Sequence, residues 1–217
     1  MKIFDVSMLI EENMTVYKDR EEKKPSLKLE KKISKDGINE STISMNLHTG
    51  THIDSPYHMQ SDGKTIESLD LSNLITKCYV FDLTNVTSGI NKSDLINLNI
   101  KEGSFVLLKT KNSFSEVFLM DFVYLTKSGA EYLAEKKIVG LGIDALGIER
   151  DQPKHDTHNI LFDNEIIIIE GLRLKEIDEG EYFMIALPIK IKGADGAPAR
   201  VVLIQEISIE DGIVLSK

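Results

Sequence analysis

All five histidines of the chain lie in two short segments, and both segments also contain acidic residues. The first segment places three imidazoles and one carboxylate within eleven residues: His48, His52, Asp54 and His58. The second has two imidazoles followed by three acids: His155, His158, Asp163, Glu165 and Glu170. Imidazole nitrogens and carboxylate oxygens, without thiolates, are typical ligands of Zn²⁺, Mn²⁺ or Fe²⁺ in catalytic sites. The pattern predicts one metal centre assembled from two distant segments.

The first segment is predicted to be extended. Ile43, Met45 and Leu47 alternate with polar residues, so odd positions are expected to face the core and even positions a polar cavity. The three histidines and the aspartate all have even numbers. A helix is opposed by Gly50 and Pro56.

A straight strand would hold the first two histidines too far apart for one ion. Residues four apart in a strand are separated by roughly 13 Å, whereas each ligand atom must come within about 2 Å of the metal. Gly50 lacks a Cβ and can adopt turn dihedrals, so we expect a bend there that returns His48 toward His52. His52 and Asp54, two residues apart, need no such bend.

Composition limits the classes of protein that need consideration. A net charge of −9 and a pI near 5.1 argue against nucleic-acid binding, which requires a basic surface. The sequence has neither an apolar run of about 20 residues nor an export signal, so we expect no membrane partner and a cytoplasmic location. The lysines between Lys18 and Lys35 alternate with acids and are expected to be solvated. The single cysteine, Cys78, is expected to be a buried thiol.

The expected architecture is one α/β domain over residues 1–217, with a mixed β-sheet and few short helices. Apolar, β-branched runs predict strands at Ser41–Leu47, Cys78–Leu83, Ser104–Lys109, Ile138–Ile143, Glu165–Ile169, Tyr182–Leu187 and Arg200–Ile207. One helix is expected to begin after Thr126 as N-cap and to extend toward Ile138. Others are expected over Ser93–Leu98 and from Asp156 or Thr157, with Ile160 and Leu161 turned inward.

The pattern His48-x-Gly50-Thr51-His52-x-Asp54-x-Pro56-x-His58 resembles the signature of the metal-dependent cyclase and kynurenine formamidase-like hydrolase family, which also includes isatin hydrolases. The resemblance continues through Val139-Gly-Leu-Gly-Ile-Asp144 and through the late Gly193-Ala-Asp-Gly-Ala-Pro198. It implies a swivelling β/β/α-like fold, a small-molecule substrate, and a homodimer or homotetramer.

The same resemblance implies a role for each site residue. The implied metal ligands are His48, His52, Asp54, His158 and Glu170, which would hold two Zn or Mn ions. Asp54, and also Glu170, could bridge the two ions, and His58 is implied as the proton donor and acceptor. Tyr17 occupies the position of an aromatic residue that lines the pocket. The Pro-Gly-Asp turn that follows this aromatic in formamidase-like relatives is missing from residues 18–25, so the entrance loop is expected to differ.

The function expected from these features is hydrolysis of a small amide or cyclic amide. Metal-activated water would be the nucleophile, and His58 the general acid and base. A mononuclear non-haem iron oxygenase is the main alternative, since its facial triad also has two histidines and one carboxylate. The other alternative is a non-catalytic metal-binding protein.

The remaining polar residues near these segments are given no part in the reaction. His155 is expected at the surface or behind a ligand, Asp144 as a strand-end residue, and Glu165 in solvent. By strand alternation, Glu170 is expected on the same face as Ile168. A metal ligand can occupy this face if it lies at the inner rim of the sheet.

Overall fold

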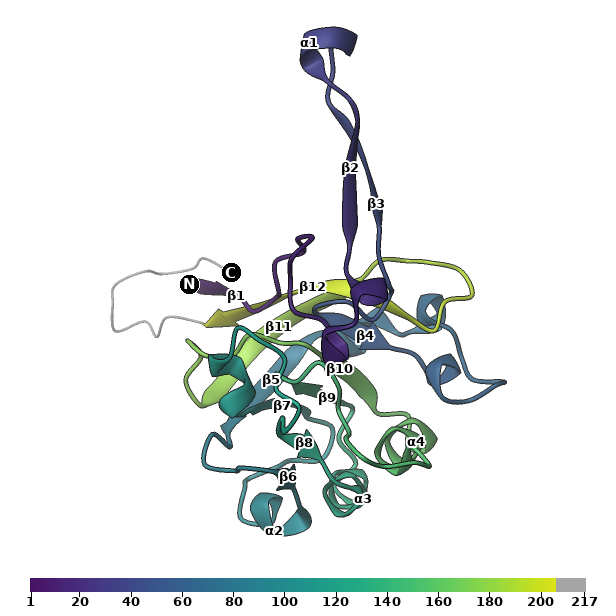
Figure 1. Ribbon diagram of the computed structural model, residues 1–217. Helices are drawn as coiled ribbons and strands as arrows, with labels where there is room; N and C mark the ends of the chain where they lie inside the picture. Colours follow the sequence, from purple (N-terminus) through teal and green to yellow (C-terminus); the bar gives the residue numbers. More distant parts are fainter. Residues whose placement is uncertain (206–217) are drawn as a thin grey trace.

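The computed structural model describes residues 1–205, which form a mixed eight-stranded sheet that closes into a barrel (Figure 1). The strand order is β1-β12-β11-β5-β7-β9-β10-β4, and a further pairing of β12 with β4 closes the barrel. The strands are β1 (Lys2–Asp5), β4 (His52–Asp54), β5 (Ile75–Asp82), β7 (Phe105–Lys109), β9 (Gly140–Ile143), β10 (Ile167–Glu170), β11 (Gly180–Pro188) and β12 (Gly196–Gln205).

The parallel strands β5, β7, β9 and β10 form the most buried part of the sheet. Every residue of β7 and β9 is buried, because both faces of the sheet are covered. On β7, Val106 and Leu108 pack toward the helices, while Phe105 and Leu107 pack into the barrel. Cys78, on β5, lies in the barrel core, and burial raises the pKa of its thiol to about 12, which confirms the expected buried thiol.

Three short helices cover one face of the sheet: α2 (Lys92–Leu95), α3 (Lys127–Glu135) and α4 (Asp156–Asp163) (Figure 1). The side chain of Thr126 accepts a hydrogen bond from Gly129 N, which confirms it as the N-cap of α3. Helix α3 ends at Glu135, so the expectation that it extends toward Ile138 is wrong; the backbone turns at Lys137, whose φ is 54°. A small parallel pairing of β6 (Gly89–Ile90) with β8 (Tyr124–Leu125) lies beside these helices.

A long hairpin projects from the body and forms an arm, which we define as residues 26–44 (Figure 1). It comprises β2 (Ser26–Lys31), a single helical turn α1 (Ile33–Asp36) and β3 (Glu40–Ser44). All of its residues are exposed, so the prediction that Ile43 faces the core is wrong, whereas Leu47, beyond the arm, is partly buried against the barrel core as predicted. The alternation exists, but it belongs to an amphipathic ribbon outside the barrel.

Most strand predictions are confirmed, with ends shifted by a few residues. The largest shift is at β12, which begins at Gly196 instead of Arg200 because its first residues pair with β4. Residues 206 and 207 of the last predicted strand lie outside the described part of the chain. Within residues 1–205, no helix reaches the length and hydropathy needed to cross a membrane.

Asp144, expected only as a strand-end residue, anchors the loop that follows β7. Its carboxylate is buried and accepts hydrogen bonds from backbone and side-chain donors of Thr110 and Ser113, and from the Asn112 side chain. Burial raises the pKa of Asp144 although these donors favour the charged form. Such a network fixes the loop beside the site described next, because an unpaired buried carboxylate would be costly.

Candidate metal centre

The two histidine-containing segments meet where β4 and β10 pair. The antiparallel register sets His52 opposite Glu170 and Asp54 opposite Ile168. Glu170 is the last residue of β10 and is buried at the rim of the sheet, where Ile168 packs toward the helices. Glu170 is thus buried on the face that it shares with Ile168, as the alternation predicts, and its role as a metal ligand stays a prediction.

A turn at Gly50 brings the first histidine of the segment back toward the second. Gly50 has a φ of 68°, and the rings of His48 and His52 have centroids 5.0 Å apart. Strand β4 itself covers only His52–Asp54, so the extended prediction holds for this part of the segment alone. His58 follows in a single 3₁₀ turn, Pro56–His58.

Gly171, directly after β10, packs against this turn and allows a stability prediction. Its φ is 70°, and a Cβ there would lie 2.4 Å from the backbone oxygen of Gly50. We expect Gly171→Ala to destabilise the fold by about 3 kcal/mol or more, because it combines left-handed strain with a backbone clash. Gly103→Ala is the matched control, since its φ is 74° with nothing within 4 Å. It should cost only about 1–2 kcal/mol. Equal midpoints of Gly171→Ala and Gly103→Ala in chemical denaturation would contradict the prediction.

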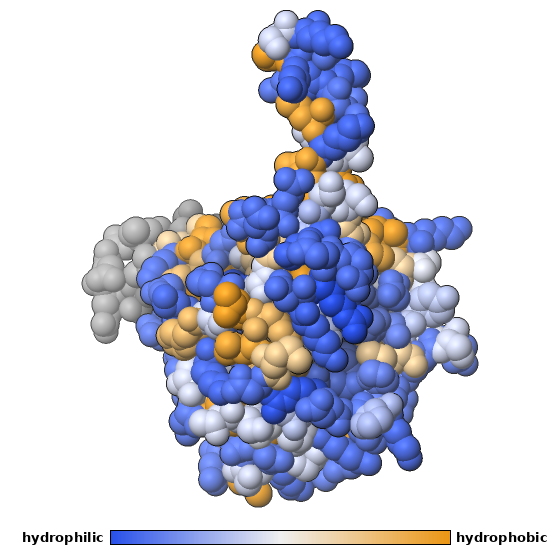
Figure 2. Space-filling view, viewed as in Figure 1, coloured by the Kyte–Doolittle hydropathy of each residue, from blue (hydrophilic) through white to orange (hydrophobic). Residues whose placement is uncertain are grey.

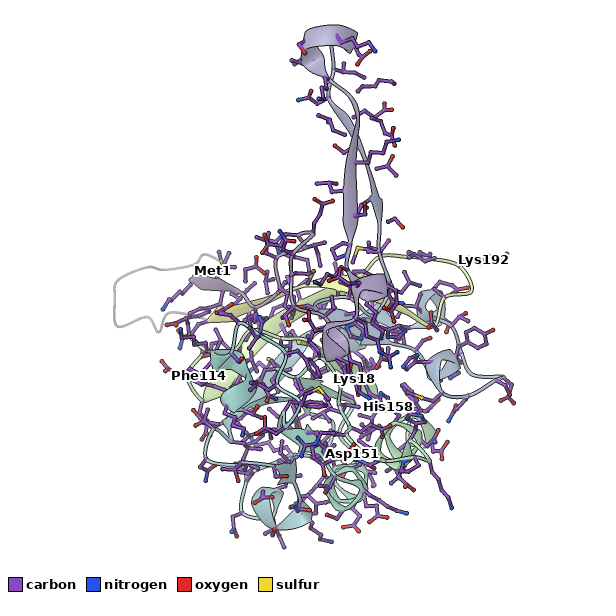
Figure 3. The ribbon with its side chains drawn as sticks, viewed as in Figure 1. Met1, Lys18, Phe114, Asp151, His158 and Lys192 are labelled. Carbon is purple, nitrogen blue, oxygen red and sulfur yellow. The ribbon has the colours of Figure 1, made fainter. Side chains whose placement is uncertain are left out.

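Four buried side chains form the centre of the site: His52, Asp54, His158 and Glu170. His52 Nε2 lies 3.3 Å from Asp54 Oδ1 and 3.4 Å from Glu170 Oε2. His158 Nε2 lies 3.5 Å from Asp54 Oδ2 and 3.6 Å from Glu170 Oε1. Each carboxylate thus directs one oxygen to each imidazole. Helix α4 supplies His158, which Figure 3 labels.

These contacts shift the pKa values of all four groups. Burial opposes the charged imidazole of His52, but contact with Asp54 and Glu170 raises its pKa to about 10. The pKa of His158 is likewise raised well above its usual value by the same carboxylates, against the effect of burial. Burial and the charge of Asp54 oppose ionisation of Glu170, yet the two histidines lower its pKa to about 2. A cation entering this cluster displaces protons from the imidazoles, so metal affinity should rise with pH.

The donor set fits a divalent metal ion. Two buried atoms of this cluster, His52 Nε2 and Asp54 Oδ2, make no hydrogen bond to any residue of the described chain. Buried polar atoms without partners are costly in free energy. The ligand atoms of His52, Asp54 and Glu170 lie within 4.8 Å of one another. Metal ions held by this cluster would satisfy the inward-facing Nε2 of His52 and Oδ2 of Asp54.

A second group of ligand atoms shares Asp54 and consists of His48, Asp54 and His58. His48 Nδ1 lies 2.8 Å from Asp54 Oδ1, and its Nε2 lies 2.8 Å from Asp195 Oδ2. The ring of His58 stacks on that of His48, with centroids 4.0 Å apart, and its Nδ1 lies 3.6 Å from the same Asp195 oxygen. Burial lowers the pKa of His58, which is therefore neutral near pH 7.

Two site residues were missed by the sequence reasoning. Asp195 lies in the Gly193-Ala-Asp-Gly-Ala-Pro198 segment that carries the family resemblance, and this segment was the available signal. Glu149 follows β9 by six residues and had no such signal. Its Oε1 lies 3.1 Å from His158 Nδ1 and is also bonded to His155 Nδ1. His155 is thus at the surface and behind a ligand, as expected, and Glu165 is in solvent.

Glu149 should tune metal binding through His158. A carboxylate on the rear nitrogen of a ligating imidazole fixes its orientation, and losing it typically costs 10–100-fold in metal affinity. We expect Glu149→Gln to weaken metal binding by about 10–100-fold, measured by competition with a chelator. The control is His155→Gln, because His155 is exposed and contacts Glu149 from outside. Wild-type affinity in Glu149→Gln would contradict this role.

A pocket of about 340 Å³ opens above these side chains. Its floor includes His158 and Glu170, and its walls include His48 and His58. Tyr17 lines the opposite side and is held by edge-to-face contacts with Phe118 and Phe122, with centroids 5.3 and 6.2 Å away. All seven sequence-predicted site residues therefore lie in or directly beneath this pocket: Tyr17, His48, His52, Asp54, His58, His158 and Glu170.

Comparisons with known proteins agree with this geometry. The family described as putative cyclase matches residues 4–150. Kynurenine formamidase of Bacillus cereus is 33% identical over 172 residues, covering 76% of this chain and 80% of that protein. A structure described as a potential metal-dependent hydrolase with cyclase activity is 51% identical, with a TM-score of 0.87 over 93% of this chain and 96% of the other. Isatin hydrolase A from Labrenzia aggregata shares the fold at 20% identity, with a TM-score of 0.82 over 94% of each chain. The chain therefore belongs to the cyclase family of metal-dependent hydrolases.

Proposed function

We propose that residues 1–217 form one hydrolase domain that cleaves the C–N bond of a small acyl or cyclic amide at two divalent ions, zinc or manganese. Metal-dependent hydrolysis of amides other than peptides is the chemistry that the family and its kynurenine formamidase relative support. The observation that carries the proposal is the position of Asp54. Its two oxygens face different histidines within one buried cluster, which is the arrangement of a bridging carboxylate.

The ligands divide into two sets around Asp54. Its Oδ1 lies 2.8 Å from His48 Nδ1 and 3.3 Å from His52 Nε2, and its Oδ2 lies 3.5 Å from His158 Nε2. Glu170 faces both His52 and His158, and is the second candidate bridge. The carboxylates of Asp54 and Glu170 offset much of the charge of two dications, so the pocket can receive a neutral or an anionic substrate.

Divalent ions lower the pKa of a bound water toward ~7 and polarise a carbonyl group. His58 is the proton carrier in this proposal: it lines the pocket, and its lowered pKa keeps Nδ1 or Nε2 free to accept a proton near pH 7. Returning that proton to the leaving nitrogen completes the cleavage. Asp195 lies beside the His58 ring and orients it.

The competing functions make different demands on these residues. A mononuclear iron oxygenase needs two histidines and one carboxylate, which leaves part of the His158, Glu170 and His58 set without a role. A non-catalytic metal-binding protein needs no neutral histidine beside the metal ligands. The presence of His58 in the pocket, with Asp195 beside its ring, favours the hydrolase.

A substrate screen tests this function. We expect the Mn- or Zn-loaded protein to hydrolyse one or more of formanilides, isatin and small cyclic amides. The missing Pro-Gly-Asp turn in residues 18–25 makes N-formylkynurenine itself a weaker candidate than amide hydrolysis in general. Absence of turnover with every amide, together with oxygen uptake by the Fe-loaded protein, would replace the hydrolase by the oxygenase.

We further propose that the protein is a cytoplasmic homo-oligomer, and the arm supports the oligomeric part of this proposal. Leu27 lies opposite Ile43 in the hairpin, and with Leu29 they form one apolar face that is 44–59% exposed (Figure 2). An isolated two-stranded hairpin is marginally stable and needs a packing partner. The same chain has an open groove of about 530 Å³ whose apolar lining includes Leu9 and Ile189. Exchange of arms between two copies would bury both surfaces.

A charge on the apolar face of the arm should therefore dissociate the oligomer. We expect Leu27→Asp to give monomers by light scattering, while wild type gives dimers or tetramers, because a buried unpaired carboxylate is costly at an interface. Thr42→Asp places the same charge on the opposite face of the hairpin and should leave the mass of the oligomer unchanged. A monomeric wild type, or a Leu27→Asp variant with wild-type mass, would contradict the arm exchange.

A further inference from the structure

The entrance to the pocket contains a positive charge that the metal centre does not use. Among residues 1–205, Lys23 is the single lysine or arginine that lines the pocket. It ends the 3₁₀ turn Glu21–Lys23, within the 18–25 loop where the chain departs from its formamidase-like relatives. The metal-ligand candidates His158 and Glu170 are buried at the floor, whereas Lys23 is half-buried at the rim.

The position of Lys23 is fixed by its backbone and by an aromatic ring. Its carbonyl oxygen accepts a hydrogen bond of 2.8 Å from Thr49 Oγ1, in the turn directly after His48. Its Nζ lies 5.3 Å from the centroid of the Tyr17 ring, within cation–π range. Gly147 supports that ring from behind, since a Cβ there would lie 2.9 Å from Tyr17 Cε2. The ammonium group is thereby kept beside the pocket.

The ion pairs within this loop involve the neighbouring lysine, Lys24, and not Lys23. Lys24 Nζ lies 2.6 Å from Glu21 Oε1 and 3.8 Å from Asp19 Oδ1. Lys23, in contrast, forms no ion pair with any carboxylate in residues 1–205. Lys18 adds a second cation 5.3 Å from the Tyr17 ring. Two ammonium groups thus lie beside the Tyr17 ring, in a chain whose net charge is −9.

We propose that Lys23 is an anion subsite, and that the substrate is an amide carrying a carboxylate on the part remote from the reacting carbonyl. This inference rests on the proposed hydrolase function and names the substrate class for the same site. The reacting carbonyl lies at the floor and the rest of the molecule extends toward the rim. Tyr17, Met59 and Leu146 give this path apolar walls suited to an aromatic ring, and Lys23 meets the carboxylate at its end.

The test compares formanilide with its 2-, 3- and 4-carboxy derivatives, because the three isomers place the carboxylate at different distances from the formyl group. For the Mn-loaded wild type, we expect kcat/KM of the best carboxylated isomer to exceed that of formanilide by about tenfold, as for a half-buried charge-assisted contact. In Lys23→Met this ratio should fall to about two, with the loss mainly in KM. Raising the salt concentration should lower the wild-type ratio.

Lys24→Met is the matched control, since it removes an adjacent lysine whose charge is paired outside the pocket. It should retain the wild-type ratio. Turnover of formanilide with an unchanged ratio in Lys23→Met would overturn the anion subsite and leave the hydrolase function standing. If no anilide is hydrolysed, the wider amide screen decides the hydrolase function, and calorimetric binding of the carboxylated anilides decides the subsite separately. Equal affinities in wild type and Lys23→Met would then overturn it.

Discussion

His58→Ala is expected to lower kcat for amide hydrolysis by about 10²–10⁴-fold, the usual contribution of a general acid and base. His58 is the one histidine of the first segment that follows the β4 turn and lines the pocket without contacting Asp54 within salt-bridge distance. Its removal should take away proton transfer while leaving the ligand cluster intact. The measurement is steady-state kinetics together with metal content by mass spectrometry.

The control for this prediction is His155→Ala, which removes another histidine from the lining of the same pocket. His155 is 55% exposed, and its ring faces Glu149 rather than the ligand cluster, so kcat should remain near the wild-type value. Full activity in His58→Ala would remove the proton-carrier role. A fall in activity accompanied by loss of metal would instead make His58 a ligand.

Asp54→Asn is expected to abolish activity together with metal binding. The substitution removes the one carboxylate in the described part of the chain that faces His48, His52 and His158 at once. Since loss of a residue behind a ligand already costs 10–100-fold in metal affinity, loss of a bridging ligand should cost at least about 100-fold. Metal per chain after dialysis and a chelator-competition titration provide the measurement.

Asp195→Asn is the comparison variant for Asp54. Asp195 is 40% exposed and also contacts His48, but its carboxylate lies on the outer side of that ring. It should retain both ions and lose activity moderately through the orientation of His58. Retention of two ions in Asp54→Asn would show that Asp54 does not bridge them.

Much of the site was predictable because all five histidines lie in two short segments that also contain acids. His52 and Asp54 share one short strand, and the bend at Gly50 follows from a distance argument and a missing Cβ. The contribution of Glu170 also follows from strand alternation, once the rim of the sheet is considered. The burial on both faces of β7 could likewise be anticipated from its continuous apolar run.

The remaining features depend on tertiary contacts that periodicity does not encode. Ile43 alternates with polar residues as a core strand does, yet it lies in the projecting arm, and only chain topology separates the two cases. Glu149 acts through His158, nine residues away, and Asp195 acts through His48, 147 residues away. Asp144 was predicted only as a strand-end residue because its hydrogen-bond partners come from the loop after β7, which is distant in sequence. Each correction arises from a contact between separate segments.

The central claim is tested most directly by titrating the metal-free protein with Mn²⁺ or Zn²⁺ and following formanilide or isatin hydrolysis in the same samples. We expect no hydrolysis without metal, and a rise in activity that reaches its maximum at two ions per chain. Full activity with no metal, or maximal turnover at a single iron with oxygen consumption, would contradict the dinuclear hydrolase.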